Sequence, residues 1–152
     1  MVKQKEDIIN LGSTLHVSGF SITGINDKGN GKEKVTNSAK KINKLRIDFN
    51  IDENLITPTG NQSLYICITG PDQKPITVEA LGSGTFTTRD GENKFFTEKV
   101  DINYVQGKKM PVNVYWKQNS PFTEGDYKIE VYNNGLKVGE GVQHLKKGGL
   151  FG

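Results

Sequence analysis

Short segments in which apolar and polar residues alternate recur along this chain, and they restrict its fold more than any other feature. In segment 45–51 every second residue is Leu, Ile or Phe, and the residues between are polar. Successive side chains of a strand point to opposite faces, so this pattern predicts a strand buried on one face. A similar alternation returns in 100–104, 112–116 and 127–131. No segment from residue 13 onward has the spacing of an amphipathic helix.

Turn signals separate the alternating segments at short intervals. The sequence Asn133-Asn134-Gly135 favours a hairpin, because Asn and Gly readily adopt the positive φ of a type I′ turn. The chain has 152 residues, 18 of them Gly, and only 34% of its residues are apolar, which fits strands that bury one face each. We therefore predict a single all-β domain, an antiparallel sandwich of about eight or nine short strands.

Four segments allow more specific predictions. Segment 15–25 should form the first strand, with a bulge at Gly19. Segment 63–69 is nearly continuous in apolar residues, which favours a central strand, and 76–81 should return beside it as a hairpin partner. Segment 26–43 is expected to be a long, polar and mobile loop.

The chain ends are expected to differ from the sandwich, which we assign to residues 13–145. Residues 1–12 form a helical or disordered lead-in: 2–10 are typical of the last turns of a helix, and Gly12 would end it. Residues 146–152 form a flexible tail rich in Gly and Lys. No stretch is long and apolar enough to span a bilayer and no signal segment follows Met1, so we expect a soluble chain, with a removed leader or anchor left open.

Segment 122–135 resembles the penultimate strand and closing hairpin of immunoglobulin-like domains. In those domains an early Tyr, here Tyr127, packs over a corner, and Trp116 resembles their core Trp. Cys67 is the single cysteine, so the resemblance implies an immunoglobulin-like sandwich without the usual disulfide. A fold of this class says almost nothing about activity.

Segments 44–54 and 64–76 are similar to the C-terminal β domain of uncharacterised Gram-negative bacterial proteins with an upstream membrane anchor or coiled coil. The likeness spans roughly residues 11–145. It implies a periplasmic or envelope location, with a cytoplasmic one left open. Some of those proteins are labelled chromosome-partition proteins, but this chain lacks a phosphate-binding Gly-rich loop with Lys and Ser/Thr.

Side chains that could carry chemistry are few. Cys67 lies in an apolar run, which is typical of a small buried hydrophobe and not of a nucleophile. His16 and His144 have no further ligands at metal-binding spacing. Segment 26–31 lacks the alternate acidic ligands and the closing Glu of a calcium loop, and no nucleophile elbow is present. We therefore expect no enzyme, no cofactor and no metal.

Positive charge is concentrated in two places. Between Asp27 and Arg46 stand seven basic residues against two acidic ones, and Lys146 and Lys147 follow near the end. A solvated loop and a frayed tail are the simpler interpretation, and a contact for an acidic partner or an anionic surface is the functional one. The net charge is only +3, and the aromatic residues are not interleaved with Lys or Arg, so no nucleic-acid partner is expected.

Five apolar residues are candidates for binding. By strand parity Phe95, Tyr115 and Tyr132 face outward, where they either stack on sugars, form a protein interface or pack under loops. Leu150 and Phe151 belong either to a disordered end or to a segment that docks on a neighbouring subunit. We expect a non-catalytic structural or protein–protein interaction module, with a protein partner or self-association. The alternative is a carbohydrate-binding module.

Overall fold

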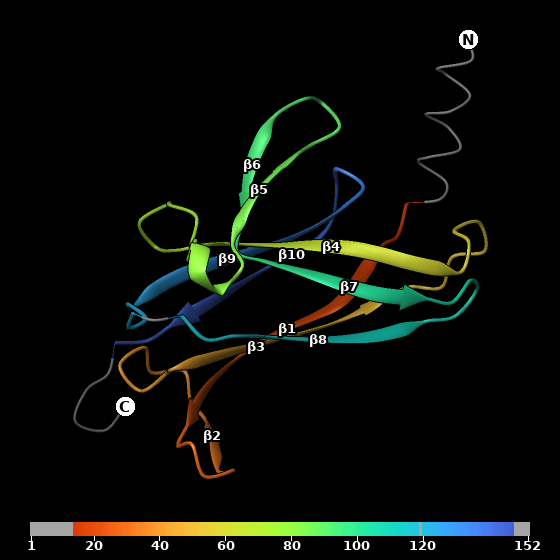
Figure 1. Cartoon of the computed structure of the whole chain (residues 1–152). Coiled ribbons are helices and arrows are strands. Elements are labelled where there is room, and N and C mark those ends of the chain that lie inside the picture. The colour runs from red at the N-terminus through yellow and green to blue at the C-terminus, as the bar shows by residue number, and fades with distance from the viewer. Residues whose placement is uncertain (1–13, 119, 148–152) are drawn as a thin grey trace.

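Two antiparallel sheets of four strands face each other in this computed structural model, which describes residues 14–118 and 120–147 (Figure 1). The first sheet has the order β2 (Glu33–Val35), β1 (Val17–Asp27), β3 (Lys44–Ile51), β8 (Met110–Trp116). The second has the order β10 (Leu136–Leu145), β9 (Gly125–Asn133), β4 (Gly60–Thr69), β7 (Glu98–Tyr104). A separate hairpin joins β5 (Gly84–Thr87) to β6 (Asn93–Phe96). The predicted all-β antiparallel sandwich is confirmed.

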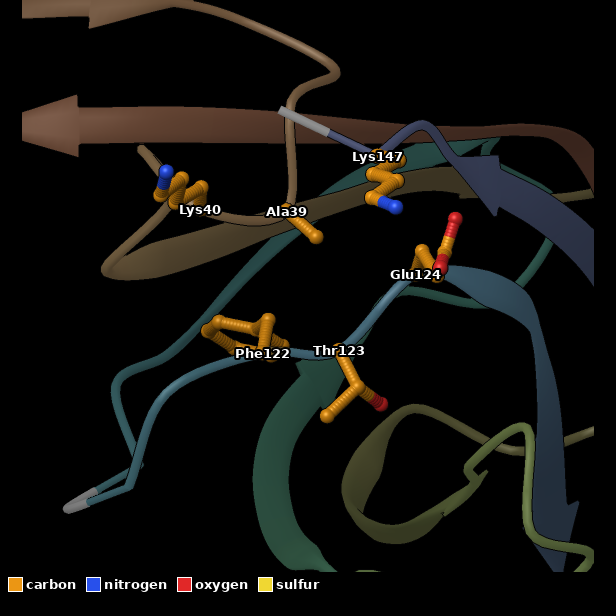
Figure 2. Close-up of a pocket in the computed structure, with 6 residues that line it drawn as sticks. All are labelled: Ala39, Lys40, Phe122, Thr123, Glu124 and Lys147. Atoms are coloured by element: carbon orange, nitrogen blue, oxygen red, sulfur yellow. The ribbon is translucent and has the colours of Figure 1, made fainter. Parts of the chain in front are cut away.

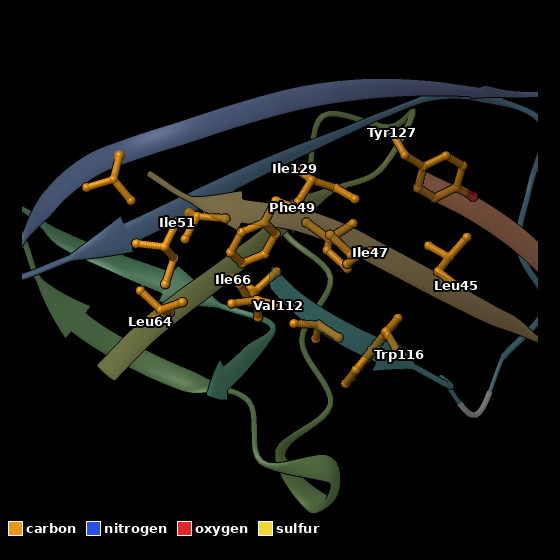
Figure 3. Packing of buried hydrophobic residues seen from close by; sticks show 14 of the residues in the cluster. Leu45, Ile47, Phe49, Ile51, Leu64, Ile66, Val112, Trp116, Tyr127 and Ile129 are labelled. Carbon is orange, nitrogen blue, oxygen red and sulfur yellow. The ribbon is translucent and has the colours of Figure 1, made fainter. Parts of the chain in front are cut away.

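The core lies between the two sheets and follows from the alternation in the sequence. On β3, buried and half-buried residues alternate without interruption, as its period predicts. Figure 3 shows its side chains meeting those of the opposite sheet, among them Leu64 and Ile66 of β4 and Ile129 of β9. Each fully buried aliphatic side chain of this kind contributes about 1.5–3 kcal/mol.

A hydrogen-bonded corner precedes β9. The Tyr127 hydroxyl donates to the Thr123 carbonyl at 2.8 Å and accepts the Thr123 N–H at 2.9 Å. Trp116 is buried, and Asn134 and Gly135 have the positive φ expected of the hairpin turn. These features agree with the immunoglobulin-like assignment, which stays a prediction.

The predicted bulge in β1 lets this strand pack against β10. The register of β1 with β3 shifts between Ser18 and Ser21, and Gly19 has a φ of 67°. Phe20 stacks on Phe49 with 5.2 Å between ring centroids. Opposite Phe20, β10 carries Gly139, where an added Cβ would lie 2.8 Å from Val17. Glycine is therefore what allows the two strands to approach.

The prediction that 76–81 pairs with the central strand is wrong beyond Ile76. The chain turns back beside β4 only as far as Ile76: Thr69 bridges Pro75, and the Ile76 N–H donates to the Ile68 carbonyl at 2.8 Å. The segment then forms a short 3₁₀ helix, η1 (Glu79–Leu81). The reason is that this edge of β4 is next occupied by Thr97, whose N–H donates to the Ile66 carbonyl at 2.7 Å, and then by β7, so a longer return strand has no edge to pair with.

The prediction of one long polar loop over 26–43 is wrong in part. This segment contains β2, and it buries Ser38, Ala39 and Ile42. Apolar residues in a mostly charged segment are easily overlooked, and here they anchor it to the sandwich. Among the residues that the structure describes, no helix is long and apolar enough to cross a membrane.

Candidate functional site

The three outward aromatic candidates lie in three different places. Tyr115 is exposed on β8, on the first sheet, with the Lys44 Nζ 5.0 Å from its ring centroid. Tyr132, on β9 of the second sheet, is half-buried, because Phe86 of the β5–β6 hairpin packs against it. Their ring centroids are 5.2 Å apart. Phe95 is exposed on β6. The structure therefore does not join them into one aromatic surface. The other two candidates, at positions 150 and 151, lie outside the described residues.

Phe95 borders a small hollow. The hollow measures about 230 Å³ and is also lined by Thr77, Glu79, Ser83 and Thr85. An aromatic face beside hydroxyls and a carboxylate is a combination that can bind polar ligands such as sugars.

The groups with nucleophilic or metal-binding potential lie apart. Burial raises the pKa of the Cys67 thiol to about 12, so this side chain stays protonated near neutral pH. His144 Nδ1 lies 2.7 Å from an Asp126 carboxylate oxygen, and both residues are exposed. His16 precedes β1 and is exposed. In the described part of the chain, no three His, Cys, Asp or Glu side chains are grouped so that they could hold a metal ion.

The structure brings the two basic segments of the sequence together. The Ala39 N–H donates to the Lys146 carbonyl at 2.9 Å, and the Lys146 N–H donates to the Asn37 carbonyl at 2.8 Å. The end of β10 is thereby fixed beside the segment that follows β2. We call the surface formed by the exposed lysines of both segments the basic surface: Lys28, Lys32, Lys34, Lys40, Lys41, Lys146 and Lys147.

The lysines of the basic surface are not engaged in ion pairs among the described residues. The nearby acids Asp27 and Glu33 both form ion pairs with Lys44, at 3.2 Å for the Asp27 carboxylate. The Glu33 hydrogen bond raises the pKa of Lys44, and hydrogen bonds from the Gly29 N–H and then from Lys44 lower the pKa of Asp27. Within residues 14–118 and 120–147, no lysine of the basic surface forms an ion pair. The surface therefore favours anionic groups.

Two hollows lie within the basic surface. One measures about 340 Å³ and lies between the start of β9 and the end of β10. Figure 2 shows Lys40 and Lys147 beside it with Phe122, Thr123 and Glu124. The other, of about 440 Å³, is lined by Asn26, Lys28, Lys34, Val35, Thr36 and Lys41. The charge counts of the sequence indicated both basic segments. Nothing in it indicated that they meet, because their contact depends on the path of β10.

Similarity to solved structures is weak. An alkylpurine DNA glycosylase from Pseudomonas fluorescens, bound to DNA with an abasic site analogue, has a TM-score of 0.49 at 10% identity and covers 90% of this chain. A GH3 β-glucosidase from Bifidobacterium adolescentis has a TM-score of 0.47 at 10% identity and covers 87% of this chain. The chain spans 31% and 17% of the lengths of these two proteins.

A family match covers most of the chain. No curated protein matches the sequence. Residues 18–146, which include every strand of the sandwich except the first residue of β1, match a family whose description names no activity. The chain belongs to this family, described as "Domain of unknown function (DUF8428)".

Proposed function

We propose that this domain is a non-catalytic interaction module that binds an acidic surface of a partner protein through the basic surface. The observation that carries the proposal is the joining of two lysine-rich segments without acidic partners of their own. Complementary charge accelerates association and selects partners, although each exposed ion pair adds only about 0–1 kcal/mol. Several lysines acting together are therefore needed for recognition.

The composition of the basic surface favours a protein partner over nucleic acid. The exposed cations of the two segments are all lysines, because Arg46 of the first segment is half-buried and pairs with Asp48 at 2.9 Å. Arg is the residue that most often reads guanine through two hydrogen bonds, and aromatic stacking platforms accompany single-stranded binding. The basic surface offers neither. Lysines act as point charges that can pair with carboxylates, and the surface lacks the groups that read nucleic-acid bases.

Charge reversal tests this proposal. The purified chain is measured against immobilised poly-L-glutamate in buffer of about 0.15 M ionic strength, where distant charges are screened. We expect the K28E/K34E/K41E variant to bind at least about tenfold more weakly, a loss of about 1.4 kcal/mol. The matched control is K74E/K108E/K109E, which changes net charge equally at exposed lysines outside the basic surface. Equal losses in both variants would show a net-charge effect and contradict the proposal.

A second candidate function is glycan binding at the Phe95 hollow, where an exposed ring stands beside Glu79 and hydroxyl groups. A glycan array with the chain and its Phe95→Ala variant tests this function. A positive signal lost in the variant would support it. Signals that are absent, or unchanged by the substitution, would remove it.

Self-association is a further proposal for the partner, and it depends on the last residues of the chain. Sedimentation velocity of the whole chain and of a version ending at Lys147 measures it. Larger species that disappear on truncation would support self-association through Leu150 and Phe151. A monomer in both cases would remove this proposal.

An envelope location is proposed on the resemblance to C-terminal β domains of Gram-negative proteins. In that arrangement the domain would end a longer protein with an upstream anchor or coiled coil. Fractionation of cells that produce the full-length protein tests the location. Recovery in the periplasmic or membrane fraction supports it, and recovery in the cytoplasm contradicts it.

A further inference from the structure

Two hollows meet at the end of β2 and share Val35 and Thr36. The first is the hollow of about 440 Å³ that carries three lysines of the basic surface. The second measures about 400 Å³ and lies beside Ile22, Gly24 and Gln143. The two hollows therefore lie next to each other along β2, and we call the region that they border the β2 groove.

One half of the β2 groove is positively charged and held in place. Lys28, Lys34 and Lys41 line it. The Asn26 side chain donates to the Lys41 carbonyl at 2.5 Å, and the Lys28 N–H donates to the Lys32 carbonyl at 3.0 Å. These bonds hold the backbone that carries the lysines, although the side chains themselves are exposed. Binding an anion here would therefore cost the protein less backbone entropy than binding on a mobile loop.

The other half of the β2 groove is uncharged and partly apolar. No Asp, Glu, Lys or Arg lines the second hollow. Val35 is 67% exposed although it belongs to a strand, and Ile22 is half-buried. Removing such apolar surface from water is favourable by about 25 cal/mol per Å². This half therefore favours an aliphatic side chain.

The edge of the first sheet runs along the same groove. β2 is paired with β1 only from Ile25 to Asp27, and the Thr36 N–H then donates to the Gly24 carbonyl at 2.9 Å. β2 is the outermost strand of this sheet, and no other described strand is paired with its outer edge. A free strand edge accepts an extended segment through main-chain hydrogen bonds, with side-chain hollows providing selectivity.

We infer that the β2 groove binds an extended acidic segment of a partner protein that also carries an aliphatic side chain. The carboxylates lie at Lys28, Lys34 and Lys41, and the aliphatic group packs against Val35. This inference rests on the proposed function and adds to it the conformation and the apolar content of the bound segment.

Fluorescence anisotropy with three labelled peptides tests the inference. The first peptide has a run of glutamates followed by leucine, the second has serine in place of leucine, and the third has glutamines in place of glutamates. We expect the second peptide to bind about five to ten times more weakly than the first, which is the cost of losing one apolar contact. The third should show no measurable binding.

Two variants assign the halves of the groove. Val35→Ser is expected to reduce affinity for the first peptide to that of the second, and to leave the second peptide unaffected. The K34E/K41E variant should no longer bind the first or the second peptide measurably, because both peptides carry the glutamates. All three positions are exposed, so the variants should fold, and circular dichroism with thermal unfolding checks this.

The outcomes separate the inference from the proposed function. Equal binding of the leucine and serine peptides, unchanged in Val35→Ser, would overturn the inference and leave the acidic-partner function standing. No loss of binding in K34E/K41E would overturn both. Tighter, Lys34-dependent binding to phosphatidylglycerol vesicles or to duplex DNA than to the first peptide would also overturn the inference, in favour of a lipid or nucleic-acid anion.

Discussion

Glu98 illustrates how a single residue can stand in unfavourable surroundings. By alternation along β7 it shares the face of the buried residues Ile102 and Tyr104. One of its carboxylate oxygens is buried without a hydrogen-bond partner among the described residues. Desolvation raises the pKa of this carboxyl above its ordinary value. The fold therefore favours the protonated form, and the stability gained at low pH is lost as pH rises through the raised pKa.

Replacing Glu98 by Gln should stabilise the protein at neutral pH. The amide has a similar shape but carries no charge, so the penalty for burying a carboxylate disappears. Urea unfolding at pH 7 should show a higher midpoint for Glu98→Gln than for the wild type. Near pH 3, where the carboxyl is protonated in both folded and unfolded states, the difference should vanish. A difference independent of pH would contradict this explanation.

The Tyr127 hydroxyl should contribute measurably to stability. Tyr127→Phe leaves the N–H and the carbonyl of Thr123 without their partner beside a buried ring. Because Thr123 is exposed and water can reach these groups, the loss should be about 0.5–1.5 kcal/mol, which chemical denaturation can measure. Tyr115→Phe is the control, because that ring is exposed on β8. A loss of equal size in both variants would show that the corner is not responsible.

At the scale of elements, the β5–β6 hairpin covers the outer face of the second sheet. Phe86 stacks on Tyr65 at 4.7 Å with nearly parallel rings, and Lys94 lies 5.4 Å from the Tyr132 ring centroid. Lys94 also lies 3.8 Å from Glu130, the cross-strand neighbour of Cys67. By strand parity Cys67 faces this outer side, yet it is buried. The hairpin thus closes over a face that a sandwich usually leaves to solvent.

Weakening the hairpin contact should expose the cysteine. Phe86→Ala removes the contacts of the Phe86 ring with Tyr65 and Tyr132. It should lower the free energy of unfolding by about 1–3 kcal/mol, less than the roughly 3–5 kcal/mol typical of a fully buried Phe. Cys67 should then react faster with a thiol reagent such as DTNB under native conditions. Phe95→Ala, on the outward side of the same hairpin, should change neither quantity. Unchanged Cys67 reactivity in Phe86→Ala would mean that other residues shield the thiol.

The sequence allowed prediction of those elements whose pattern is local. Segment 45–51 differs from β3 by a single residue, and the Asn134-Gly135 turn needs only its own φ angles. Segment 76–81 failed because its pairing depends on whether distant strands occupy the edges of β4. The basic surface also depends on contacts between distant segments, so the sequence indicated its two basic segments but not that they form one surface. Its geometry comes from the contact of Lys146 with Asn37 and Ala39.

At the scale of the whole molecule, the end of the sandwich away from the basic surface carries an exposed apolar tip. Leu55 is 77% exposed, Ile56 58% and Val105 44%. The tip is well held: the Tyr104 hydroxyl accepts the Asn54 N–H at 2.9 Å and donates to the Asn54 carbonyl at 3.1 Å. These side chains are therefore exposed on an ordered backbone and contribute little to the core.

The double variant L55S/I56S should consequently keep its stability within about 0.5 kcal/mol, as expected for surface positions. Ile51→Ser, at the end of β3 where the side chain is fully buried, should lose more than about 2 kcal/mol. Thermal unfolding of the three proteins measures both effects. A large loss in the tip variant would show that these residues support the fold.

The positions at which the chain enters and leaves the sandwich have a mechanical consequence. The start of β1 and the end of β10 lie at opposite ends of the sandwich (Figure 1). Thr14, before β1, is held through the Asn54 side chain, and Lys146, after β10, is held beside Ser38. A tension applied between these points is directed along β1 and β10. It loads the hydrogen bonds of β1 with β3 in shear, so that they resist together and do not open one after another. In a longer protein under load, this domain would transmit force before it unfolds.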